Sequence, residues 1–290
     1  MEIIRTSAWM KQVAAEARRG ERLLGLVPTM GALHEGHFSL VREARRQCSP
    51  VVVSIFVNPK QFGPAEDFQK YPRSFGADRA ALEDLRVDYV FAPPPEEIYP
   101  AGFRTSVNVE GLSDRLEGRA RPGHFRGVTT VVLKLFELAQ PRFAFFGRKD
   151  AQQALIIRQM ARDLDLDAEI VVCPIVREPD GLAMSSRNAY LSTDERRAAK
   201  VLSQSLDRAR REIEAGETDV VRLAAAVRAA VEKEPRVALD YAEIVDADTL
   251  EPAITLRKPA YILLAAKVGD TRLIDNALIE PAGDSLRVTI

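Results

Sequence analysis

The sequence predicts an α/β protein with a doubly wound parallel sheet, Rossmann-like, followed by a smaller C-terminal α+β domain. From Leu23 to about Pro174, short apolar runs alternate with helical patterns, which is typical of βαβ units. These runs are apolar on both faces, so helices are expected on both sides of the sheet. After Ser192 the pattern changes to charged helices and a hairpin. We therefore expect domains at 1–176 and 177–290.

The elements of the first domain follow in order. The opening MEIIRTSAWMKQVAAEARRGE is expected to form a strand and an amphipathic helix, and not a signal peptide, because charges interrupt its apolar residues. The sheet strands are expected at 23–27, 51–57, 87–92, 142–146 and 169–173. Helices are expected at about 37–47, 75–85, 127–139 and 150–163; the third has an apolar stripe of Val128, Val131, Val132, Leu135 and Phe136.

The second domain is expected to begin with one long charged helix, with Thr193 as its N-cap and Gly216 as its stop. A second helix is expected at about 219–232, and the Val268-Gly269-Asp270 turn predicts a hairpin. The Pro179-Asp180-Gly181 turn marks the linker region.

The composition of the 290 residues favours small-molecule partners. The net charge of −1 and pI of about 6.4 offer no basic field for nucleic acid or an anionic membrane. No apolar run approaches the roughly 20 residues that cross a bilayer. Cys48 and Cys173 have no metal-ligand spacing and make no disulfide framework, which suits a reducing compartment. We expect a cytoplasmic protein with core cysteines.

The segment LVPTMGALHEGHFSL runs from the first sheet strand through a glycine turn into a helix. His34 and His37 flank Gly36 at the start of this helix, where free backbone N–H groups and the helix dipole favour anions. Gly31 and Gly36 let the backbone approach a ligand. Two imidazoles can donate to phosphate oxygens there, so this loop predicts a nucleotide phosphate site.

All three histidines, including His124, occur in glycine-containing loops, which disfavours scattered structural roles. Zinc remains an alternative for the His34 and His37 pair, although no cysteine or HExxH pattern supplies further ligands. We rank phosphate above zinc.

Three further segments carry polar residues beside expected strand ends or loops. FVNPKQF places the amides of Asn58 and Gln61 at the carboxyl edge of the sheet, where they suit a hydroxyl-bearing acid. RLEGRARPGHFRGVTTVV contains Glu117, Arg121, His124 and Arg126, and its glycines 118, 123 and 127 suggest a mobile lid whose arginines attract anions. FGRKDAQQ delivers Lys149 towards phosphates, Asp150 as a helix cap, and Gln153 towards the acid.

The last motif is Met184-Ser185-Ser186-Arg187, whose hydroxyls and guanidinium form a set of phosphate donors. A helix-capping turn is the alternative for this loop. We detect no nucleophile paired with a positioned base, so activation is expected to occur on the substrate.

Taken together, these motifs resemble, in the same order, those of the pantothenate synthetase family. The His-x-Gly-His loop is similar to the HIGH signature of the nucleotidyltransferase superfamily, and PTMGALHEGH is specific to pantothenate synthetases within it. The Met-Ser-Ser-Arg loop looks like the counterpart of the synthetase KMSKS loop. Ala151 departs from the aromatic residue that is usual after the Lys-Asp pair, which removes bulk near Gln153.

The resemblance implies ATP-dependent condensation of pantoate with β-alanine through pantoyl adenylate, with release of AMP and pyrophosphate. It implies a homodimer, Mg²⁺ on the phosphates, and Asp78 as a metal ligand, beside Ala77 where relatives carry a carboxylate. His37, as proton donor, His34 and Lys149 would be catalytic. Gln61, Gln153, Asn58 and His124 would bind pantoate, and Gln61 also β-alanine. ATP would contact Met30, Gly31, Ala32, Leu33, His34, Glu35, Gly36, His37, Gly147, Arg148, Lys149, Asp150, Val176, Met184, Ser185, Ser186 and Arg187.

Two other functions share parts of this pattern. A phosphopantetheine adenylyltransferase uses the same ATP signature, but such chains are typically shorter and lack FVNPKQF. A non-catalytic ATP sensor or an RNA-binding synthetase relative is the second alternative; the acidic pI and the lack of a basic, aromatic-rich face disfavour RNA.

Overall fold

The structure is a computed structural model that describes residues 1–64, 66–283 and 285–290. The chain forms two compact units. The first contains residues 1–148 and 152–174, and the second contains residues 149–151 and 175–290.

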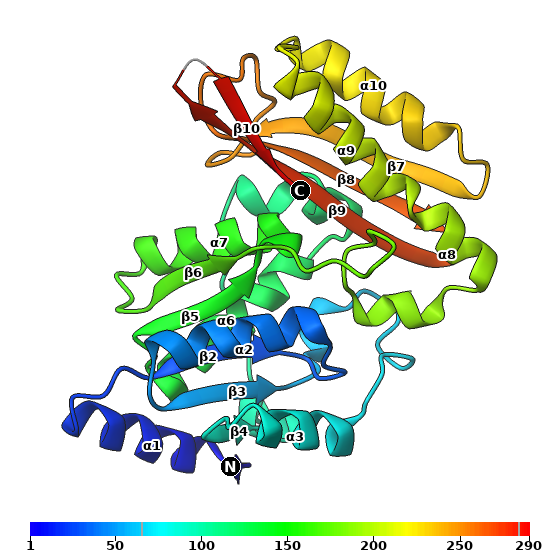
Figure 1. The fold of residues 1–290 in the computed structure, drawn as a ribbon. Helices are drawn as coiled ribbons and strands as arrows, with labels where there is room; N and C mark the ends of the chain where they lie inside the picture. Colours follow the sequence, from blue (N-terminus) through cyan, green and yellow to red (C-terminus); the bar gives the residue numbers. More distant parts are fainter. Residues whose placement is uncertain (65, 284) are drawn as a thin grey trace. The chain divides into compact units, whose positions relative to one another are not determined.

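The first unit is built on a six-stranded sheet in which every pairing is parallel, in the order β1-β4-β3-β2-β5-β6 (Figure 1). Its strands are β1 (Glu2–Ile4), β2 (Gly25–Thr29), β3 (Val51–Ile55), β4 (Tyr89–Phe91), β5 (Phe143–Gly147) and β6 (Glu169–Cys173). The chain passes from β2 to β3 and β4 on one side, then crosses to β5 and β6 on the other. The carboxyl ends of β2 and β5 therefore border the switch point where such sheets bind ligands.

Helices cover both faces of this sheet, which confirms the doubly wound prediction. Helices α1 (Ser7–Arg19), α6 (His124–Ala139) and α7 (Ala151–Asp163) pack on the face that receives Leu26 of β2. Helices α2 (Glu35–Gln47) and α3 (Phe75–Asp84) pack on the face that receives the next residue, Val27. The stripe predicted on α6 is buried, and so are both free cysteines.

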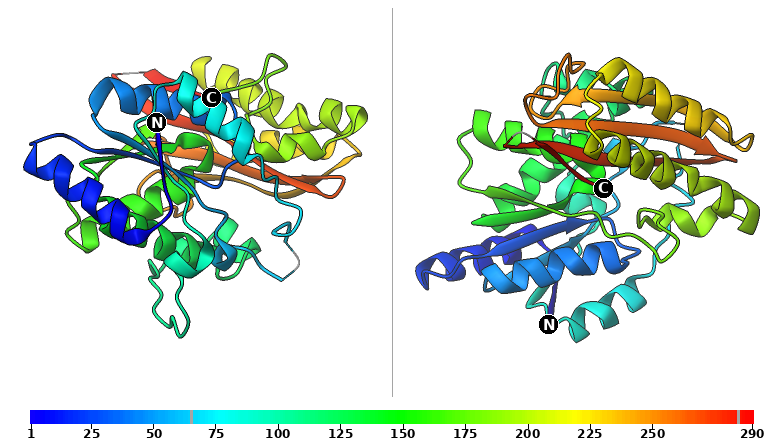
Figure 2. Two further views of the ribbon diagram at one scale, coloured as in Figure 1. Left: turned by 90° about the horizontal axis from the view of Figure 1, so that it is seen from below. Right: turned by 45° about the horizontal axis from the view of Figure 1, so that its top comes forward.

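The second unit contains an antiparallel sheet in the order β10-β9-β8-β7. Its strands are β7 (Val237–Asp246), β8 (Ala260–Val268), β9 (Thr271–Ala282) and β10 (Ser285–Thr289). Helices α9 (Val201–Glu214) and α10 (Val220–Glu232) share the core of this sheet. Figure 2 shows these helices in yellow-green and yellow beside the orange and red strands. The predicted hairpin is confirmed, because β8 and β9 are joined through Gly269 at φ 58°.

The prediction of one long charged helix is wrong. Two helices replace it, α8 (Thr193–Ala199) and α9, with Lys200 between them. The N-cap is Ser192 and not Thr193, because the Ser192 side chain and Glu195 form a reciprocal capping box. No glycine or proline lies at the break near Lys200, so the helical pattern of the sequence continues across it and gives no sign of two helices.

Short elements complete the described chain: α4 (Pro95–Ile98), α5 (Glu117–Ala120) and 3₁₀ turns at Pro59–Gln61, Leu112–Asp114, Arg148–Asp150 and Ser186–Tyr190. Among the residues described, no helix is both long and apolar enough to span a membrane.

Candidate active site

The predicted histidine loop connects β2 to α2 at the switch point of the first unit. His34 is the N-cap of α2, and its Nδ1 accepts from the Gly36 N–H at 3.2 Å. The Nδ1 of His37 accepts from the His34 N–H at 3.3 Å, and the two ring centroids lie 4.1 Å apart. Because each Nδ1 is an acceptor, a neutral imidazole carries its proton on Nε2. Two Nε2–H donors thus accompany the helix N-terminus, an arrangement that suits an anion such as phosphate.

Asp78 of α3 holds the same loop in place. Its carboxylate accepts from the backbone N–H groups of Ala32 and Leu33, each at 2.9 Å, and from the Ser74 hydroxyl at 3.0 Å. Ala32 has a positive φ of 50°, a conformation that needs such support. Asp78 is 3% exposed. These contacts make Asp78 an anchor of the histidine loop, and its assignment as a metal ligand stays a prediction.

A conservative change at Asp78 tests this anchoring role. We expect Asp78→Asn to lower turnover about 10-fold or more. The asparagine amide has only one acceptor oxygen, so its NH₂ group would face one of the two backbone N–H groups that the carboxylate accepts from. Turnover is measured by steady-state assay and folding by thermal melting. Asp84→Asn, an exposed position on the same helix, serves as the control. Unchanged turnover in Asp78→Asn would show that the histidine loop does not depend on this carboxylate.

Asn58 and Gln61 come together after β3, but they have different roles. Asn58 is 1% exposed; its Nδ2 donates to Gln61 Oε1 at 3.0 Å and to the Gly127 carbonyl at 3.1 Å. Its Oδ1 accepts from the Tyr99 hydroxyl at 2.8 Å. Both ends of the Asn58 amide are engaged within the protein, so Asn58 orients the Gln61 side chain, and its direct pantoate contact stays a prediction. Gln61 is half-buried, and its Nε2 lies 3.2 Å from Met30 Sδ.

His124 has a similar supporting role. Its Nδ1 lies 2.8 Å from the Gln61 carbonyl, and its Nε2 lies 3.1 Å from Arg121 Nη1. Burial, reinforced by the Arg121 charge, lowers the pKa of His124 to about 4. The neutral ring therefore donates from Nδ1 to Gln61 and accepts from Arg121. These contacts engage both ring nitrogens, and the direct pantoate contact of His124 stays a prediction.

The segment predicted to be a mobile lid is tightly packed at two of its glycines. A Cβ on Gly118 would lie 1.8 Å from the Ser113 carbonyl oxygen, and one on Gly127 would lie 2.2 Å from that of Lys60. Arg121 forms two hydrogen bonds to Glu66, at 2.9 and 2.6 Å, and the attraction of anions by its charge stays a prediction. Gly118 and Gly127 thus allow two backbone segments to pack closely, so these two glycines are not evidence that the segment is a mobile lid.

The packing at Gly127 leads to a prediction that joins stability to substrate binding. Gly127→Ala would force α6 away from Lys60 and Gln61, and overpacking of this kind costs about 1–3 kcal/mol. We expect a lower melting temperature and a KM for the acid substrate raised more than that for ATP. Gly76→Ala is the control, because Gly76 is exposed in α3 and nothing lies within 4 Å of its added Cβ. Equal effects on both KM values would contradict the placement of Gln61 on the acid side.

Lys149 and Gln153 lie at and just after the turn that follows β5. The Lys149 side chain is 20% exposed, and its Nζ lies 3.9 Å from Asp150. Gln153 is half-buried in the first turn of α7. Its neighbour Gln152, which sequence reasoning missed, is buried and bonds the backbone of Leu112, Arg115 and Glu117. Only the adjacent amides in the sequence hint at this role.

In the second unit, a small hairpin carries the Met184–Arg187 loop. Arg177 pairs with Ala183, and the Met184 N–H donates to the Val176 carbonyl at 3.0 Å. Ser185 Oγ accepts from the Arg187 N–H at 3.3 Å, so Ser185 caps the turn Ser186–Tyr190. The capping alternative is thus realised at Ser185, and its hydroxyl proton can still be donated. Arg196 of α8 braces the hairpin through Glu178 and Asp180.

The doubly wound sheet and its histidine-bearing helix start define a nucleotide-binding α/β enzyme. The family model for pantoate-beta-alanine ligase matches residues 2–278. The chain belongs to this family, and it is therefore a ligase that forms a carbon–nitrogen bond.

Similar proteins agree with this assignment. A pantothenate synthetase of Koribacter versatilis is 53% identical over 285 residues, covering 98% of each chain, and one of Acidobacterium capsulatum is 58% identical over 260 residues, covering 90% of this chain and 87% of the relative. The crystal structure of pantothenate synthetase from Thermus thermophilus has a TM-score of 0.90 at 46% identity, covering 95% of this chain and 98% of that one. The ligase of Francisella tularensis, complexed with β-γ ATP and β-alanine, has a TM-score of 0.76 at 34% identity, covering 95% and 97%.

Proposed function

We propose that this chain uses ATP to condense pantoate with β-alanine, giving pantothenate, AMP and pyrophosphate. The observation that supports this most directly is the pair of Nε2–H donors on His34 and His37 at the start of α2. An anion-binding helix start with two fixed donors suits the phosphates of ATP. The solved relative with bound ATP analogue and β-alanine supports the same substrates.

The reaction proceeds in two steps. A pantoate carboxylate oxygen attacks the α-phosphorus of ATP, and the bond to the leaving pyrophosphate breaks. The amine of β-alanine then attacks the acyl carbon of pantoyl adenylate, the bond to AMP breaks, and the amine loses a proton. Catalysis rests on positioning and charge stabilisation, because no nucleophile with a positioned base is required.

Residues of the first unit would hold the phosphates and the acid. His34 and His37 donate hydrogen bonds to phosphate oxygens and stabilise the charge that grows on the departing pyrophosphate. Proton transfer from His37 stays a prediction, because it needs a ring that carries protons on both nitrogens. Gln61 and Gln153 bind the pantoate, with Gln61 held by Asn58 on its side chain and by His124 on its carbonyl.

Residues of the second unit would add positive charge and hydroxyl donors. The Lys149 ammonium stabilises the charge that grows at the α-phosphate in the transition state. Ser185, Ser186 and Arg187 bind phosphate oxygens, with Arg187 able to reach two oxygens at once. Val176, whose carbonyl accepts from the Met184 N–H, contacts the adenine through its backbone.

Mg²⁺ would arrive with the phosphates of ATP and not in a protein cage. Within the described ranges, no group of three or more His, Cys, Asp and Glu side chains could hold a metal ion, and Asp78 holds the histidine loop. Mg²⁺ that is held mainly by phosphate oxygens needs only one or two protein carboxylates, so no step is assigned to a resident metal. The homodimer and the cytoplasmic location stay predictions.

Product analysis tests this function. We expect pantothenate and AMP to form in equal amounts when the protein receives pantoate, ATP, Mg²⁺ and β-alanine. When β-alanine is omitted, neither product should form over multiple turnovers. Mass spectrometry follows both products. AMP that stays joined to an acceptor, or no turnover at all, would contradict the proposal.

A further inference from the structure

Two adjacent polar residues, Asp275 and Asn276, are buried in β9 at 3% and 1% exposure. Leu273, Ala277 and Ile279 of the same strand are buried apolar residues of the core. Polar groups inside a core cost free energy unless they are hydrogen-bonded. The partners of this pair therefore indicate what it is for.

Asp275 is bonded to the hairpin that carries Met184–Arg187. Its two carboxylate oxygens accept from Arg177 at 2.8 and 2.9 Å, and Arg177 also donates to the Gly181 carbonyl at 3.0 Å. Arg177 is the residue that pairs with Ala183, one position before Met184. A two-bond ion pair of this kind fixes orientation as well as distance.

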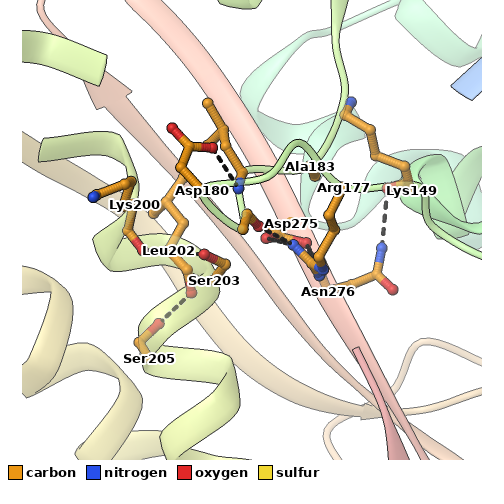
Figure 3. A network of polar contacts seen from close by, with 12 residues as sticks. Lys149, Arg177, Asp180, Ala183, Lys200, Leu202, Ser203, Ser205, Asp275 and Asn276 are labelled. Carbon is orange, nitrogen blue, oxygen red and sulfur yellow. Dashed lines mark hydrogen bonds and ion pairs between the residues drawn. The ribbon is translucent and has the colours of Figure 1, made fainter. Parts of the chain in front are cut away.

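Asn276 is bonded to the backbone of Lys149. Its Nδ2 donates to the Lys149 carbonyl at 3.0 Å, and its own N–H donates to the Asp275 carboxylate at 2.8 Å. Figure 3 shows both branches, one running from Asp275 to Arg177 and the other from Asn276 to Lys149. One dipeptide of β9 thus contacts two segments to which phosphate roles are assigned.

We propose that Asn276 is a positioning residue for Lys149, and that the Asp275–Asn276 pair holds Lys149 in register with the Met184–Arg187 hairpin. This inference rests on the proposed role of Lys149 at the α-phosphate. A hydrogen bond to the Lys149 carbonyl fixes the backbone from which the ammonium extends, and a misplacement of about 1 Å can cost about 100-fold in rate.

A double-mutant cycle tests the proposal in the full-length protein. Exchange of labelled pyrophosphate into ATP with pantoate present reports the first step. We expect Asn276→Ala to slow this exchange about 10- to 100-fold. In a Lys149→Ala background, the same change should have little further effect. Both variants act on the same contact, that of the Lys149 ammonium with the α-phosphate, and this contact is already absent in Lys149→Ala. Attack of β-alanine on supplied pantoyl adenylate should be slowed much less.

Two further variants separate positioning from folding. Ile279→Val weakens the same strand away from Lys149, so it should lower the melting temperature and leave exchange within about twofold. Asn276→Leu keeps the buried volume without a donor, and we expect the same exchange loss as for alanine. Losses that add in the double mutant, or that slow both steps equally, would overturn the inference. A wild-type exchange rate in the Lys149→Ala single variant would instead contradict the proposed role of Lys149. The inference about Asn276 would then fail as well, because it rests on that role.

Discussion

Replacing His34 or His37 with alanine is expected to lower turnover by about 100-fold or more, because a lost preorganised donor costs about that much. The two rings lie 4.1 Å apart, and each Nδ1 accepts a backbone N–H, so each Nε2–H is held in one direction. Turnover is measured in steady state, and folding by circular dichroism.

His34 needs a second variant because it also caps α2, and loss of an N-cap side chain costs about 1 kcal/mol of stability. His34→Asn keeps a good capping side chain and removes the Nε2–H donor. We expect it to fold with normal stability and to show the same loss of turnover. Near-normal turnover in His34→Asn would mean that His34 contributes only the cap, and the phosphate contact would be withdrawn.

Lys149→Met should have a comparable effect, lowering kcat by about 100-fold with little change in the KM for ATP. Methionine keeps the length of the side chain and removes the charge. If the ammonium acts mainly in the transition state, excess ATP cannot restore the rate. Lys267→Met, an exposed position on β8, is the matched control and should retain full activity. Rescue of Lys149→Met by excess ATP would make Lys149 a ground-state binding residue.

Much of the fold and the location of the site could be predicted from local patterns. The parallel strands were visible as short apolar runs, and the position of His34 and His37 at a helix start followed from a glycine turn after a strand. These features depend on residues close together in the chain, where spacing reports geometry directly. Their outcome in the structure confirms the doubly wound sheet and the histidine pair at the start of α2.

The roles of Asp78, Asn58 and His124 could not be predicted in this way. Asp78 bonds Ala32 from 46 positions away, and His124 bonds Gln61 from 63 positions away. Sequence patterns identify polar residues near a site, but they do not show which polar atoms already have partners within the protein. All three residues have partners in the loops that carry His34 and Gln61, and the ligand contacts that we assigned to them stay predictions.

Oxygen-18 placed in the pantoate carboxylate tests the adenylate mechanism most directly. That carboxylate is expected to attack the α-phosphorus, so one labelled oxygen comes to bridge the acyl carbon and the phosphorus. When β-alanine attacks, the bond between the acyl carbon and this oxygen breaks, and the labelled oxygen must pass into AMP. We expect each AMP formed with fully labelled pantoate to carry one oxygen-18, with the other retained in the amide of pantothenate. AMP that contains no label would contradict attack by pantoate on ATP.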